Sequence, residues 1–179
     1  MENLKKNPSQ SAGSMQNNAF FQNVIMRHPH SRATLTNEIT AMEKDQKADE
    51  KAKQYLKWIL KQTEFNFYLS ILPQGQGLVL LKQNLKAVLV IGFNRPHQDL
   101  KPFVEGHDFV IEVLNIHSLQ KGEAYKVMQK VIDLSNQLQS PICLMVETEQ
   151  HQKYFERYGF KNLVALEKEN EYTMIFQNK

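Results

Sequence analysis

Apolar residues recur along this chain with two different spacings, and the spacing changes near Thr63. Between 49 and 62 they fall three and four apart, which predicts an amphipathic helix. The residues on its apolar face are Ala52, Tyr55, Leu56, Ile59 and Leu60. After Thr63 come short apolar runs at 65–72, 77–82 and 87–93, separated by PQGQ and KQNLK, and they predict an antiparallel meander.

The N-terminal region holds little that a core could use. Residues 1–18 are rich in Asn, Ser, Gln and Lys and predict a disordered tail. Phe20, Phe21, Val24 and Ile25 then recur at helical spacing and stop before Pro29, which predicts a short helix. The pattern of 31–47 leaves a helix and a loop equally open.

The second half reads as strand, helix, strand, helix and a final strand pair. A loop at 94–108, with two prolines and a glycine, precedes these elements. The predicted ranges are strand 109–117, helix 122–138, strand 141–147, helix 150–158 and strands 162–167 and 171–177. We therefore expect one mixed α/β (α+β) domain over 19–179, with N-terminal helices at 19–64 and a sheet core at 65–179.

Composition narrows the function classes. The chain has 179 residues and a net charge of +3, and residues 65–179 carry twelve basic and twelve acidic side chains, so this half predicts no nucleic-acid surface. The single cysteine, Cys143, lies in an apolar strand and predicts a buried structural thiol. No pair of His and Cys has metal-ligand spacing, so the sequence predicts no metal site. Lys82 and Lys86 interrupt the longest apolar region, so it predicts no membrane contact. We therefore expect a cytoplasmic protein.

Gly122 stands where strand 109–117 gives way to helix 122–138. Glycine weakens helix interiors but permits turns and close backbone approach, and the free amides of a helix's first turn attract anions. This turn predicts a site for a phosphate-bearing ligand.

The segment around this turn resembles the GNAT superfamily of acetyl-CoA-dependent N-acetyltransferases. VIEVLNIH at 110–117 is similar to the strand before that family's acyl-CoA loop, and LQKGEA at 119–124 matches its R/Q-x-x-G-x-G/A motif at Gly122 and Ala124. ICLMVET at 142–148 and YFERYGF at 154–160 resemble its next strand and its closing F-Y-E-x-x-G-F segment. The resemblance implies a GNAT-like, mostly antiparallel sheet flanked by helices, with a central βαβ unit.

The resemblance also implies where acetyl-CoA binds, as a co-substrate. The loop amides hold its pyrophosphate, and the pantetheine arm lies between strands 109–117 and 141–147. Carried over, the coenzyme-binding residues are Leu114, Ile116, Leu119, Gln120, Lys121, Gly122, Glu123 and Ala124.

Acetyl transfer needs a base for the amine and an acid for the departing thiolate. The resemblance assigns the base to Glu112, which could equally be an exposed strand residue or a salt-bridge partner. The family's acid is a tyrosine, and here Tyr154 and Phe155 stand in inverted order, so the candidate acids are Tyr154 and Tyr158.

Three functions remain open at this point. The first is an N-acetyltransferase acting on an amine of unknown identity, as a monomer or a homodimer. The second is a catalytically degenerate acyl-CoA-binding or protein-interaction module, which Leu119, Glu123 and Phe155 would permit because they depart from the family motif. In the last of these functions, the basic N-terminal part of the chain is an arm that binds a partner or nucleic acid. Lysines on an amphipathic helix usually form only a solvated face, however.

Overall fold

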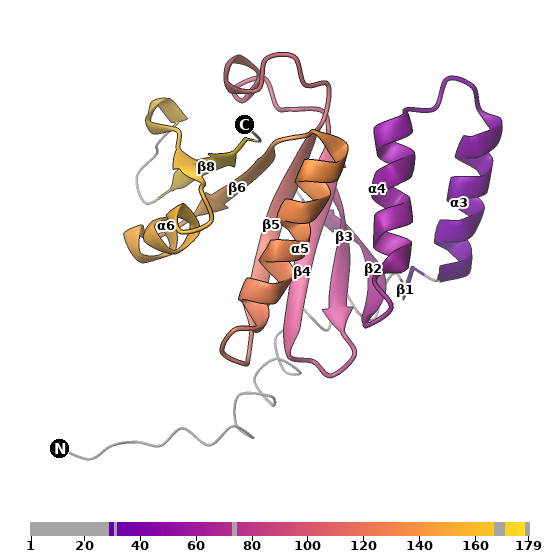
Figure 1. The fold of residues 1–179 in the computed structure, drawn as a ribbon, viewed down its shortest axis with the longest axis horizontal. Coiled ribbons are helices and arrows are strands. Elements are labelled where there is room, and N and C mark those ends of the chain that lie inside the picture. The colour runs from indigo at the N-terminus through magenta and orange to yellow at the C-terminus, as the bar shows by residue number, and fades with distance from the viewer. Residues whose placement is uncertain (1–28, 31, 73–74, 167–170, 178–179) are drawn as a thin grey trace.

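Eight strands form a single sheet in the computed structural model of this protein, in the order β1-β2-β3-β4-β5-β6-β8-β7 (Figure 1). Residues 29–30, 32–72, 75–166 and 171–177 are described. The tail predicted at 1–18 and the helix predicted before Pro29 lie outside these residues. In chain order the elements are β1 (Pro29–His30), α3 (Arg32–Lys44), α4 (Glu50–Lys61), β2 (Phe65–Leu72), β3 (Gly75–Lys82), β4 (Ala87–Asn94), η1 (Lys101–Phe103), β5 (Val110–Ser118), α5 (Glu123–Leu138), β6 (Ile142–Val146), α6 (Glu149–Glu156), β7 (Lys161–Asn162), η2 (Val164–Leu166) and β8 (Tyr172–Phe176).

All neighbouring strands pair antiparallel except β5 and β6, which pair parallel and are joined through α5. The three short apolar runs after Thr63 form the predicted meander, β2-β3-β4. The expected mixed, mostly antiparallel sheet with a central βαβ unit is therefore confirmed.

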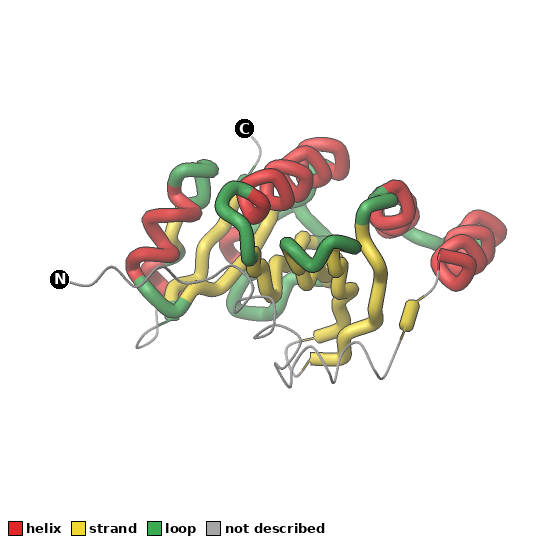
Figure 2. Tube along the Cα trace, turned by 90° about the horizontal axis from the view of Figure 1, so that it is seen from below, coloured by secondary structure: helices red, strands yellow, loops and turns green. Residues whose placement is uncertain are grey.

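Successive residues of the central strands contribute to opposite faces of the sheet, as the period of a strand requires. On β4, Leu89 and Ile91 belong to the main core cluster, whereas Val88 and Val90 belong to a second one. Helices α3, α4 and α5 lie along the face of the main cluster (Figure 2). The α5 side chains predicted to face the sheet are buried: Val127, Met128, Val131, Ile132, Leu134 and Leu138.

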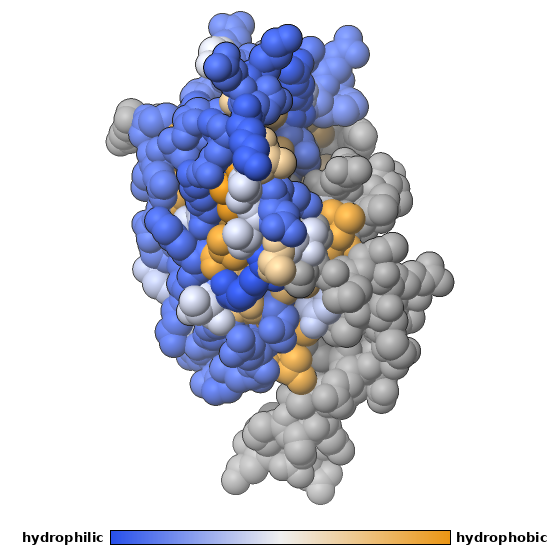
Figure 3. Space-filling view, turned by 90° about the vertical axis from the view of Figure 1, so that its right-hand side faces the viewer, coloured by the Kyte–Doolittle hydropathy of each residue, from blue (hydrophilic) through white to orange (hydrophobic). Residues whose placement is uncertain are grey.

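The segment that the sequence left undecided is helix α3. Its Leu35 and Ile39 are buried against α4, which Asp49 caps by accepting a hydrogen bond from the Ala52 amide at 2.9 Å. Three lysines of α4 bind protein groups: Lys51 donates to the Gln139 carbonyl at 3.0 Å, Lys53 pairs with Glu50 at 2.6 Å and Lys57 pairs with Glu43 at 2.7 Å. Seen from the α3 side, the visible surface is mostly hydrophilic (Figure 3).

Two short segments differ from the prediction. The predicted strand 162–167 is wrong: it consists of the two-residue β7 followed by the 3-10 turn η2. After Leu163 donates to the Thr173 carbonyl at 2.8 Å, Leu166 donates back to the Leu163 carbonyl, so the chain turns away from β8. Within the predicted loop 94–108, η1 forms one helical turn that begins beside Pro102. No described helix is both long enough and apolar enough to cross a membrane.

Candidate active site

β5 and β6 pair over only part of their length. Their parallel pairing covers 111–113 of β5 and 142–144 of β6 in the described chain. Beyond these residues the two strands diverge toward the start of α5 (Figure 1). Strand pairing therefore does not occupy the backbone groups on the facing edges of β5 and β6 past these residues.

A β-bulge at Leu114 marks the point of divergence. Val113 pairs with Ile91 and Asn115 pairs with Val90, so Leu114 is the extra residue on β5. Strand alternation alone would place Leu114 and Ile116 on one face. The bulge instead packs Leu114 against the second cluster and Ile116 against the main core, on opposite faces. These two predicted coenzyme contacts are therefore not brought together on a single face.

The turn after β5 has the conformation that the glycine predicted. Gly122 has a φ of 86°, in the left-handed region, and is the N-cap residue of α5. A Cβ placed on it would meet no atom within 4 Å, so the space beside this turn is open. Amides at the start of a helix lack intrahelical acceptors and carry the positive end of the helix dipole.

The other residues of this loop divide into exposed and packed ones. Gln120 and Lys121 are exposed, and Ala124 is half-buried in the first turn of α5. Leu119, at the family's Arg or Gln position, packs against the second cluster and donates its amide to the Lys86 carbonyl at 3.0 Å. Leu119 thus anchors the loop to the sheet.

Glu123 does not oppose an anion as its position in the motif suggested. Its side chain is 8% exposed and pairs with Lys82 on β3 and, at 2.9 Å, with Lys126 one turn along α5. The hydrogen bond from Lys82, followed by that from Lys126, lowers the pKa of Glu123 to about 2. Two lysines offset one carboxylate, so the group carries net positive charge beside the helix start.

Glu112 lies on β5 where the parallel pairing still holds. Its Oε2 accepts a hydrogen bond from Asn94 Nδ2 at 2.6 Å, and its half-buried side chain is neither fully exposed nor held in a salt bridge among the described residues. Cys143 stands opposite it in register and is buried, as predicted. Burial, with the Glu112 charge adding to it, raises the pKa of the Cys143 thiol to about 12. The Cys143 side chain is thus an inert neutral neighbour of the candidate base.

Tyr154 and Tyr158 form a pair on one side of α6. Their hydroxyls lie 2.7 Å apart, and burial together with this hydrogen bond raises the pKa of Tyr158. The ring of Tyr158 also lies against that of Tyr125 in the first turn of α5, with centroids 5.6 Å apart. Phe155 is 6% exposed and packs in the core against Phe160, and its ring also contacts the ring of Tyr154, with centroids 5.2 Å apart. The inversion in the motif therefore places the phenylalanine in the core and the two hydroxyls beside the α5 terminus.

The candidate base and acids are not in direct contact. No hydrogen bond in the described chain joins Glu112 to either tyrosine, and the Glu112 side chain lies on the sheet face opposite α5. A reactant between them would have to span the unpaired edges of β5 and β6. No cluster of three potential metal ligands occurs among the described residues.

Sequence reasoning missed four residues of this region. Lys126 could have been found from its spacing of three from Glu123 on a helix. Lys82, Asn94 and Tyr125 carry no such local signal, because strand pairing and helix packing bring them to the site.

The chain was compared with protein-family models, curated proteins and solved structures. No protein-family model matches the sequence. No curated protein matches it either. The structure is similar to PH1933 from Pyrococcus horikoshii (TM-score 0.45, 16% identity, 99% of this chain and 97% of that one). It is also similar to Arabidopsis thaliana Naa50 in complex with a bisubstrate analogue (TM-score 0.42, 12% identity, 57% of this chain and 72% of that one). A third similar structure is a GNAT-family acetyltransferase from Listeria monocytogenes (TM-score 0.39, 10% identity, 82% of this chain and 85% of that one).

The mixed, mostly antiparallel sheet with one parallel pair follows from the strand order and the β5–β6 pairing of this structure.

Proposed function

We propose that this protein transfers an acetyl group from acetyl-CoA to an amine. The observation that carries the proposal is the coincidence of two features at one place. β5 and β6 stop pairing on the side that leads to the glycine turn. There the Glu123 amide donates to the Gln120 carbonyl at 3.2 Å, whereas the next two amides of the first α5 turn have no intrahelical acceptor and can bind phosphate. A long, flexible thioester with a pyrophosphate at one end suits the unpaired strand edges and this turn.

The coenzyme is held by groups along these edges and the turn. Its pyrophosphate meets the amides around Gly122 and Ala124, with Lys121 and Lys126 as cationic partners. The pantetheine arm passes between the strands beside Leu114 and Ile116. Glu123 supports this arrangement because it fixes Lys126 within hydrogen-bond distance, at 2.9 Å, near the turn.

Glu112 is the proposed base of the reaction. It takes a proton from the ammonium form of the acceptor, directly or through water, and Asn94 orients its carboxylate. The free amine then attacks the thioester carbonyl carbon. A C–N bond forms and the C–S bond breaks. The departing thiolate takes up a proton, and the nitrogen releases its second proton to the group that supplied it, which leaves the amide, the free thiol and the proton held by Glu112.

The tyrosine pair is the proposed source of the proton that the thiolate takes up. The raised pKa keeps Tyr158 protonated at neutral pH, so the pair retains a hydrogen to donate. The same shift makes Tyr158 a weaker acid, and this observation favours the second candidate function, a module that binds acyl-CoA without transferring the acyl group.

Two measurements test the proposal. Calorimetric titration with acetyl-CoA and with free coenzyme A is expected to give micromolar binding for both. Release of free thiol in the presence of a panel of amines separates the enzyme from the binding module. No heat of binding at millimolar ligand would refute both functions.

A further inference from the structure

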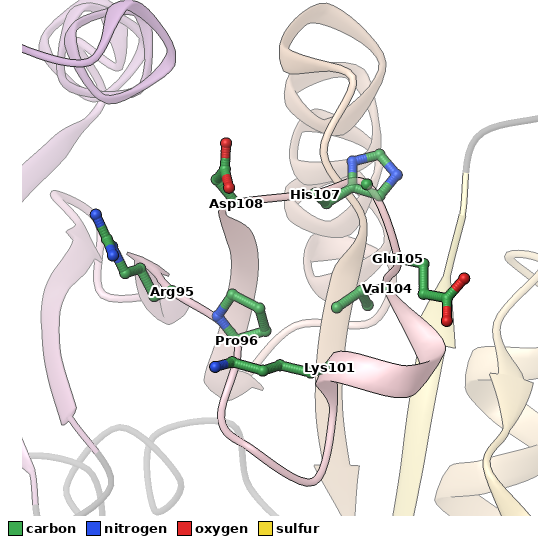
Figure 4. Close-up of a pocket in the computed structure, with 8 residues that line it drawn as sticks. Arg95, Pro96, Lys101, Val104, Glu105, His107 and Asp108 are labelled. Atoms are coloured by element: carbon green, nitrogen blue, oxygen red, sulfur yellow. The ribbon is translucent and has the colours of Figure 1, made fainter.

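A pocket of ≈ 370 Å³ lies in the loop between β4 and β5 (Figure 4). Its charged and titratable lining residues are Arg95, Lys101, Glu105, His107 and Asp108. The volume is within the range of small-molecule sites, which run from about 300 to 1,000 Å³. None of these residues belongs to the coenzyme site described above.

The lining carries two cations and two carboxylates. No ion pair is recorded, in the described chain, between the two cations and the two carboxylates of the pocket. In Figure 4, Arg95 and Lys101 flank Pro96 on one side of the pocket, and Glu105 lies on the other. The Arg95 guanidinium is 6.0 Å from the centre of the Phe109 ring, a contact that limits its motion.

The pocket adjoins the candidate base. Asn94, which binds the Glu112 carboxylate at 2.6 Å, is the residue immediately before Arg95. Val104 of the pocket wall packs with Val110 and Cys143. These two residues flank Glu112 along β5 and across to β6, and they share its sheet face. A molecule in this pocket therefore lies on the same face as Glu112, opposite α5.

We propose that this pocket binds the acceptor, and that the acceptor is a small zwitterionic amine, with the amino group and an anionic group on one short chain. The inference rests on the proposed acetyl transfer. The anionic group, a carboxylate or a phosphate, pairs with Arg95 and Lys101, and the ammonium faces Asp108 and Glu112. A ligand of a single charge would leave either the cations or the carboxylates of the pocket unmatched.

Three primary amines with the same two-carbon spacing test the charge requirement. They are β-alanine with a carboxylate, O-phosphoethanolamine with a phosphate, and n-propylamine with neither. Each is titrated into the protein saturated with coenzyme A, and binding is followed by calorimetry. We expect one of the anionic amines to bind at least about tenfold more tightly than propylamine, because hydrogen bonds to charged groups add substantially to affinity. The better of the two identifies the anionic group.

Paired variants test the residues. Arg95→Gln with Lys101→Gln should remove most of that preference, and Lys44→Gln on α3, whose side chain is exposed outside the pocket, should retain it. The affinity for coenzyme A, measured first, should be unchanged in all variants.

The outcomes separate the two proposals. Absence of coenzyme binding refutes the proposed function. Coenzyme binding with equal affinity for all three amines, or a preference that survives in the Arg95/Lys101 double variant, overturns the acceptor assignment alone.

Discussion

The carboxylate of Glu123 is held between two lysines at the start of α5. The nearly buried side chain binds Lys82 and Lys126, and its pKa is lowered to about 2 by these contacts. A carboxylate with a lowered pKa contributes stability above its ordinary pKa of 4.5, and the contribution is lost as the pH falls toward 2. The residue therefore links the charge at the coenzyme loop to the stability of the fold.

The first prediction follows from this linkage. Glu123→Gln is expected to lower the free energy of unfolding at pH 7 and to reduce its fall between pH 4.5 and 2, measured by urea denaturation at several pH values. Glu147→Gln, at an exposed position, serves as the control. If both variants show the same pH dependence as the wild type, the two lysines do not hold Glu123 in the way described.

Catalytic roles at the residue scale can be separated by pairs of substitutions. Glu112→Gln should lower turnover by about 10²–10⁴-fold, the usual contribution of a general base. Tyr154→Phe should lower it by less than about tenfold, because Tyr158 keeps a hydroxyl 2.7 Å from the lost one. The double variant at Tyr154 and Tyr158 should lose more than either single variant.

The control for these rates is the affinity for acetyl-CoA, which none of the variants should change. A loss on the order of 10³-fold for Tyr154→Phe alone would identify Tyr154 as the acid. An unchanged rate in the double variant would place the proton donor elsewhere.

At the scale of elements, the turn from β5 into α5 combines two requirements. Gly122 needs a φ of 86°, and the space beyond it must be open to a ligand. Asparagine tolerates the left-handed region better than most residues, and it has the shape of aspartate without the charge. The two substitutions therefore separate backbone strain from electrostatics.

We expect Gly122→Asp to weaken acetyl-CoA binding by more than tenfold relative to Gly122→Asn, since only the former places a negative charge beside the helix start. Thermal unfolding should show similar losses of stability for both, because they share the backbone strain. Equal affinities in the two folded variants would contradict the assignment of the pyrophosphate to this turn.

At the scale of the whole molecule, one sheet joins the N-terminal meander to the βαβ unit through the antiparallel β4–β5 pair. The elements from β1 to β8 are therefore predicted to unfold in one cooperative transition. A ligand present at a hundred times its Kd adds about 2.7 kcal/mol to the free energy of unfolding. For a chain of this length that corresponds to a rise in Tm of roughly 5–10 °C.

Scanning calorimetry with and without acetyl-CoA tests this prediction. A single peak that shifts as a whole is expected. Two peaks, of which acetyl-CoA moves only one, would show that the meander and the βαβ unit unfold as separate units.

Features that depend on neighbours along the chain could be predicted from the residues alone. Helix α5 and its buried face followed from residues spaced three and four apart, and the turn at Gly122 followed from a residue that tolerates a positive φ. The burial of Cys143 followed from its apolar strand. The periods of helices and strands act over a few residues, so a linear pattern records them.

Contacts between residues distant in sequence could not be predicted and are visible in the folded chain alone. In the folded chain, Glu123 forms an ion pair with Lys82, and Asn94 donates a hydrogen bond to Glu112. The rings of Tyr125 and Tyr158 are in contact. Strand β5 is also bulged at Leu114, which moves Leu114 and Ile116 to opposite faces against the strand period. Register and packing are set by the partner strand and by the opposing helix, and neither is written in the local sequence.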